Sequence, residues 1–191
     1  MIEIMIVMVI LVAVLAIGAP MMFTTSSAMR GAIREMAVRT REIRNVGRLY
    51  GSTMRLVINM NDDKGHSYWV ESAPGSITLL SDEQRKEMEK LTTAQREDEA
   101  PKKEFEVDSR VMKNPQKLPR GMFFESVEYS NRESIESGPA FIHFFPQGLS
   151  EASAIHLTDR KNLNWTITTN PLTGRADVFE RKISLKELEE K

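Results

Sequence analysis

The stretch IMIVMVILVAVLAIGAPMMF, residues 4–23, is almost unbroken apolar sequence without a charged side chain. Twenty residues of α-helix rise about 30 Å, the thickness of the hydrocarbon core of a bilayer. The run is apolar on every face, and a domain of this size could hardly bury such a helix on all sides. These observations predict an N-terminal transmembrane helix over residues 1–23.

A cleaved secretory signal is the alternative interpretation of the same stretch. Such a signal begins with basic residues and has a shorter apolar core, whereas the first basic residue of this chain is Arg30. We therefore favour a retained helix. Its orientation is a separate question, because the arginines that follow it would place their side in the cytoplasm by the positive-inside rule.

The composition limits what the rest of the chain can be. About 170 residues follow the apolar segment, which is enough for one globular domain with a core. The net charge of −1 argues against a general nucleic-acid binder. The absence of cysteine excludes disulfides, thiolate metal sites and thiol nucleophiles.

The apolar run ends at Pro20, which removes a helix hydrogen bond and predicts a helix kink, with a restart of the helix after it. Residues 24–50 then predict an amphipathic helix that continues into the globular domain. Mostly apolar residues recur in this helix at alternating steps of four and three and so fall on one face, which we call the seam. The seam consists of Met29, Ile33, Met36, Thr40, Ile43, Gly47 and Tyr50. This seam packs either on the chain's own sheet or partly on a neighbouring chain. The arginines off the seam are interleaved with Glu35 and Glu42, which predicts a solvated face rather than a site for lipid or DNA.

Residues 51–181 predict a β-sheet domain, because apolar and polar residues alternate between turn signals. The expected strands are 54–60, 66–72, 76–80, 121–129, 140–145, 153–158, 163–169 and 175–180. Mixed charges over 81–104 predict an exposed helical excursion or a mobile insertion, and 182–191 is a charged tail. The fold class is α+β, with one long transmembrane/amphipathic helix packed on an antiparallel sheet.

Motifs for catalysis or cofactor binding are missing from the sequence. There is no phosphate-binding glycine loop, no GxSxG and no HExxH. His66, His143 and His156 fall in or beside expected strands without metal-ligand spacing, so structural roles are expected of the last two. Asp62 and Asp63 are explained by turn chemistry. We predict no enzyme activity, no metal and no cofactor.

The N-terminal sequence MIEIMIVMVILVAVLAIGAP resembles the start of mature type IV pilins and type II secretion pseudopilins. The matching positions are Ile2, Glu3, Met5, Val7, Leu15, Ala16, Ala19 and Pro20. The stretches FFPQGLSEASAIHLTD (144–159) and WTITTNPLTGRADV (165–178) are similar to H-type minor pseudopilins and FimT/FimU-like minor pilins. Both stretches contain turn motifs of that subfamily, F-x-P-x-G and PLTGR.

The resemblance implies processing and an assembly role. Family members carry a basic leader that a prepilin peptidase removes before N-terminal methylation. This chain opens at Met1, so we expect translation to begin upstream, and basic residues of that leader would resolve the orientation conflict. Glu3 matches the acid that pairs with the N-terminal amine of a neighbouring subunit. The alternative is that Glu3 simply lies at the level of lipid headgroups.

The function implied is that of a minor pseudopilin, a structural subunit of a type II secretion pseudopilus for protein secretion. It would be a single-pass inner-membrane protein with its C-terminal domain in the periplasm. Its partners would be inner-membrane lipid and other pilin or pseudopilin subunits of a filament. The alternative is a minor type IV pilin for priming of pilus assembly or DNA uptake. Nucleic acid is not the expected partner, because residues 160–191 carry nearly balanced charges. A membrane-anchored enzyme is a third interpretation that no motif supports.

Overall fold

The computed structural model describes most of the chain: residues 2–61, 65–76 and 105–189. Within the first helix, the side chains of residues 2 and 14–26 lie outside this description. Three sequence-based expectations therefore fall outside the described residues: the charged excursion 81–104, the turn acids Asp62 and Asp63, and the strand 76–80 beyond residue 76.

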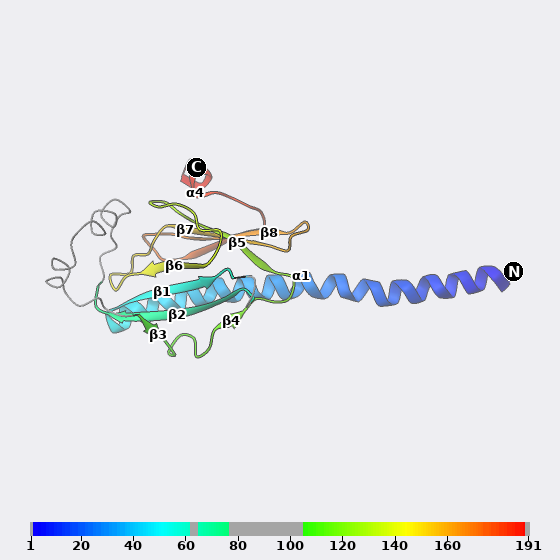
Figure 1. Cartoon of the computed structure of the whole chain (residues 1–191), viewed down its shortest axis with the longest axis horizontal. Coiled ribbons are helices and arrows are strands. Elements are labelled where there is room, and N and C mark those ends of the chain that lie inside the picture. Colours follow the sequence, from blue (N-terminus) through cyan, green and yellow to red (C-terminus); the bar gives the residue numbers. More distant parts are fainter. Residues whose placement is uncertain (1, 62–64, 77–104, 190–191) are drawn as a thin grey trace.

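Helix α1 extends from Ile2 to Tyr50, and its N-terminal part projects well beyond the sheets (Figure 1). The predicted seam of its second half is buried from Met29 to Gly47. The exception is Tyr50, which is 57% exposed. The helix ends there because Gly51 adopts the left-handed conformation, with φ of 61°, that terminates many helices.

The strands form two antiparallel sheets. The first has the order β3-β2-β1-β6, with β4 also pairing with β2, and the second has the order β5-β7-β8-β9. The first sheet consists of β1 (Ser52–Asn59), β2 (Ser67–Pro74), β3 (Glu106–Val107), β4 (Gln116–Lys117) and β6 (Pro139–Phe144). The second consists of β5 (Phe123–Tyr129), β7 (Ser153–Thr158), β8 (Asn164–Thr169) and β9 (Ala176–Phe179). A short helix, α4 (Leu185–Glu189), follows β9.

The core lies where the seam of α1 meets these sheets. Helix α1 contacts β1, β6 and β9, so it touches both sheets. Leu56 of β1 pairs with Ile142 of β6, and both belong to one apolar cluster with the seam. Helix α1 and strand β1 approach closely at Gly47, where a Cβ would lie 3.0 Å from Cγ of Met54. A glycine at this position lets helix and strand meet closely.

The predicted transmembrane helix over 1–23 was wrong. Among the described residues, no helix is long and apolar enough to cross a membrane. The inner-membrane location with a periplasmic domain, which depended on this helix, is overturned with it.

The predicted architecture needs two further corrections. The class is α+β with antiparallel strands, but the strands form two sheets where one was expected. The helix packs on them only with its second half, because residues 3–13 are exposed and pack on no sheet. Helix α1 is continuous through Pro20, so a restart after this residue was also wrong. A kink at Pro20 stays a prediction.

Candidate assembly site on the N-terminal helix

The first candidate site is the exposed apolar part of α1, residues 4–12. Every side chain in it is large and apolar, and the exposed fractions range from 51% at Leu11 to 70% at Met5. Figure 1 shows this part of the helix at the end remote from the sheets. Burying one such side chain fully is worth about 1.5–3 kcal/mol. A continuous apolar surface of this kind marks an interaction site.

Glu3, the residue predicted to serve in assembly, is exposed in the first turn of α1. It directly precedes the apolar surface. The N-terminal end of a helix carries a partial positive charge, so an acid is favourable there. Glu3 is thus placed at the free tip of the candidate site, and its pairing with a neighbouring subunit stays a prediction.

A second cluster joins the two turn motifs that carried the resemblance. The Nε of Arg44 donates a hydrogen bond to the carbonyl of Gly148 in the F-x-P-x-G turn (3.0 Å). The PLTG turn lies against the same side chain, since a Cβ on Gly174 would overlap Cδ of Arg44. Ser150 links the two turns directly, because its N–H donates to the carbonyl of Pro171 (2.9 Å). Both motifs therefore serve to hold Arg44 of α1.

Glycine is required at both turns for the same two reasons. Gly148 and Gly174 have positive φ angles of 90° and 58°, which side chains disfavour. A Cβ on Gly148 would also lie 2.9 Å from Cδ of Arg48, so the Arg48 side chain would have to move. The sequence analysis did not predict the role of Arg44. The glycines of the two turns could have indicated it, because glycine often stands where another part of the chain comes close.

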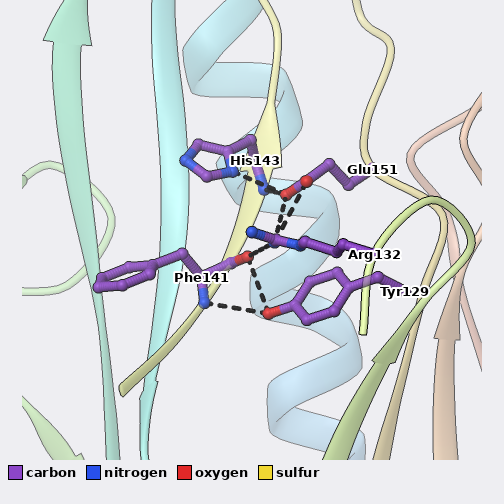
Figure 2. Close-up of polar contacts among 5 residues, drawn as sticks. All are labelled: Tyr129, Arg132, Phe141, His143 and Glu151. Atoms are coloured by element: carbon purple, nitrogen blue, oxygen red, sulfur yellow. Dashed lines mark hydrogen bonds and ion pairs between the residues drawn. The ribbon is translucent and has the colours of Figure 1, made fainter. Parts of the chain in front are cut away.

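A buried polar network connects the two sheets (Figure 2). The carboxylate of Glu151 accepts hydrogen bonds from the backbone N–H of His143 (2.8 Å) and from Arg132 (3.2 Å), and it lies 2.7 Å from Nδ1 of His143. Arg132 and the hydroxyl of Tyr129 both donate to the carbonyl of Phe141 (2.6 and 3.0 Å). Burial raises the pKa of Tyr129 to about 12. Most polar atoms of these side chains are paired within the cluster, with Nε of Arg132 the buried exception, and this pairing indicates a structural network.

The other two histidines also lie between strands. Nδ1 of His66 accepts the N–H of Phe124 at 3.0 Å and so ties the start of β2 to β5. His156 lies between Thr166 (3.1 Å) and Glu128 (3.2 Å). Burial lowers the pKa of His156, and the nearby carboxylate of Glu128 opposes that shift only in part. Among the described residues, no histidine belongs to a group that could hold a metal ion.

The end of α1 is fixed by an ion pair. Asp108 is buried, and its carboxylate accepts hydrogen bonds from Nε of Arg110 (3.0 and 3.2 Å). The guanidinium of Arg110 in turn lies over the ring of Tyr50, 4.2 Å from its centre. Burial acts to raise the pKa of Asp108, but hydrogen bonds from Arg110 and Ser72 outweigh it and hold this pKa below its usual value.

Comparisons with protein-family models, with curated proteins and with solved structures gave no match for this chain. The interpretation of the site therefore depends on its own geometry and on the sequence resemblance. That geometry combines an exposed apolar helix with a domain that grips only the other half of the same helix.

Proposed function

We propose that this protein is a structural subunit of a helical filament, a minor pseudopilin of a type II secretion pseudopilus, rather than an enzyme. The observation that carries the proposal is the exposed apolar surface of residues 4–12 on a helix that projects from the folded domain. Similar helices from other subunits are the occupants that suit it. They are apolar on all sides and can pack around it in parallel.

The physical argument is one of area. The chain's own sheets bury only one face of α1, the seam. Several parallel helices around α1 can bury the apolar surface on all of its faces at once. Each side chain that passes from water into such a bundle adds about 1.5–3 kcal/mol when fully buried. In a bundle of this kind, Glu3 would lie in a medium of low dielectric constant. Pairing with the N-terminal amine of a neighbour would there neutralise both charges.

A cysteine cross-linking experiment tests the assembly surface directly. The natural chain has no cysteine, so Val7→Cys introduces a unique thiol on the apolar surface. Leu172→Cys is the matched control, because Leu172 is 74% exposed on the turn between β8 and β9. We expect oxidation to give disulfide-linked dimers of Val7→Cys and few of Leu172→Cys. Equal yields from both variants would contradict assembly through residues 4–12.

A genetic experiment tests which filament is involved. The gene is deleted in the source bacterium, and secretion of folded exoproteins and surface piliation are measured side by side. Loss of secretion with normal pili supports the pseudopilin proposal, and loss of pili with normal secretion supports the minor type IV pilin instead. Complementation with Glu3→Gln should fail to restore the lost activity. Full activity of the deletion strain in both assays would exclude either role.

A further inference from the structure

The second half of α1 carries a line of arginines that the proposed assembly site does not use. The positions follow alternating steps of four and three, and we call the line the arginine ladder: Arg30, Arg34, Ala37, Arg41, Arg44 and Arg48. Such spacing keeps residues on one face of a helix. Each position follows one residue of the buried seam, so the ladder lies about 100° around the helix from it. From end to end it rises about 27 Å.

Four of the five arginines in the ladder are exposed: Arg30, Arg34, Arg41 and Arg48. In the described part of the chain, no acidic side chain forms an ion pair with any of these four. The acids that interleave with them in the sequence are engaged elsewhere. Glu35 and Glu42 both pair with Arg39, at 3.6 and 2.8 Å. The sequence predicts a solvated face here, and these four arginines are exposed.

This separation follows from helical geometry. Glu35 and Glu42 each come one residue after a ladder arginine, which places them about 100° further round the helix. There they meet Arg39 rather than the ladder. Like charges three or four residues apart on a helix repel each other and destabilise it. The ladder thus concentrates positive charge in one line, and the acids of the neighbouring line pair with Arg39 instead.

The surroundings of the ladder favour a protein over a nucleic acid as the partner. Exposed aliphatic side chains flank the arginines, with Val38 64% exposed and Leu49 77% exposed. Arginine beside exposed apolar groups is typical of protein interfaces, whose cores are enriched in arginine and poor in lysine. The ladder positions carry no aromatic side chain on which bases could stack.

We propose that the arginine ladder docks an acidic α-helix of another protein subunit, with carboxylates at the same alternating spacing of four and three. Guanidinium groups bind carboxylates through paired hydrogen bonds, which gives the contact both strength and direction. Helices whose contact residues share this repeat cross at about 20°, so their facing lines stay together from Arg30 to Arg41. Arg44 and Arg48 already lie against the domain's own turns at Gly148 and Gly174. The docking does not require assembly through residues 4–12.

Two synthetic peptides test the proposal with the full-length chain. Both are helical and have the same composition, but only the first has glutamates at the ladder spacing; the second has them spread around the helix. Binding is measured by fluorescence anisotropy at low salt. We expect the first peptide to bind about tenfold tighter than the second, equivalent to ~1.4 kcal/mol. Salt should weaken its binding, because the contact is between exposed charges.

Charge-reversal variants locate the contact. Arg34→Glu combined with Arg41→Glu should weaken binding of the first peptide about tenfold or more. Lys161→Glu combined with Lys186→Glu is the control, because it changes the net charge equally at exposed residues outside α1. If circular dichroism shows that the ladder variant is misfolded, Arg34→Gln with Arg41→Gln replaces it. Equal effects of ladder and control variants would overturn the proposal. So would equal affinity for both peptides, or a DNA duplex that binds the ladder more tightly than the first peptide.

Discussion

Residues 4–12 and residues 29–47 belong to the same helix, but their apolar side chains have opposite environments. In the first region apolar residues occupy every face, and each is more than half exposed. In the second they follow one seam, and the two sheets bury it. The difference shows how much of a helix's apolar surface its own domain can bury. A sheet covers one line along it, so a helix that is apolar all round needs partners from outside the chain.

The largest effect is expected from a charge in the buried seam. Ile43 is fully buried, and Ile43→Asp would place a carboxylate in the core without a partner. The free energy of unfolding should fall by about 4 kcal/mol or more, since buried unpaired charges are among the costliest substitutions. Urea denaturation followed by circular dichroism measures this. A loss below about 1 kcal/mol would mean that the domain does not depend on the seam.

A methyl group at Gly174 should weaken the contact between the turn after β8 and Arg44 of α1. Gly174→Ala combines a positive φ with an overlap against Arg44, and we expect a loss of about 2–3 kcal/mol in stability. Gly121→Ala is the matched control, because Gly121 has φ of 82° but open space around it. It should lose only about 1 kcal/mol, from backbone strain alone.

A double variant separates the two causes at Gly174. Combining Gly174→Ala with Arg44→Ala removes the overlap, so the loss due to the glycine substitution should shrink to about that of Gly121→Ala. Thermal melts of the wild type, the two single variants and the double variant give the comparison. If the loss is unchanged without Arg44, the turn does not clamp the helix through this side chain.

A smaller effect that depends on pH is expected at Asp108, which holds the end of α1 through Arg110 and Tyr50. Its pKa is lower in the folded state than in the unfolded chain, where it is about 3.9. The ion pair therefore stabilises the fold above pH ~4, and this contribution is lost as the pH falls through the lowered folded-state value. Asp108→Asn should cost about 1–2 kcal/mol at pH 7.

The same variant should also be less sensitive to acid. Because the amide that replaces the carboxylate cannot be protonated in this range, the difference in stability between wild type and Asp108→Asn should narrow below about pH 4. Denaturant titrations at neutral pH and in an acidic series measure it. A constant difference over the whole series would show that the carboxylate is not the source of the stability.

The smallest effect on folding is expected in the exposed half of the helix. Ile6→Asp with Ile10→Asp changes residues that the domain does not touch, so the free energy of unfolding should stay within about 0.5 kcal/mol of wild type. Self-association measured by analytical ultracentrifugation should nevertheless fall sharply, because two charges now interrupt the apolar surface. If self-association is unchanged, residues 4–12 are not the assembly surface, and the proposed difference between the two halves of α1 is wrong.

Several strands could be predicted because alternating apolar and polar residues are typical of a strand with one buried face. The strand expected at 153–158 coincides with β7, and those expected at 140–145 and 163–169 differ from β6 and β8 by one residue. Division into two sheets could not be predicted, since alternation does not say which strands are neighbours. The network around Glu151 was missed for a similar reason, because it joins residues from different strands and loops.

The sequence by itself determined the elements of this protein: a helix with one buried seam, short antiparallel strands, and an apolar N-terminal run led by Glu3. These depend on local periodicity, which needs no knowledge of distant residues. Only the tertiary structure decided how far the sheets reach along the helix, that two separate turns hold Arg44, and that Glu35 and Glu42 pair with Arg39 and leave the arginine ladder exposed. These outcomes depend on which side chains meet in space, and spacing along the chain constrains that only within a single helix or strand.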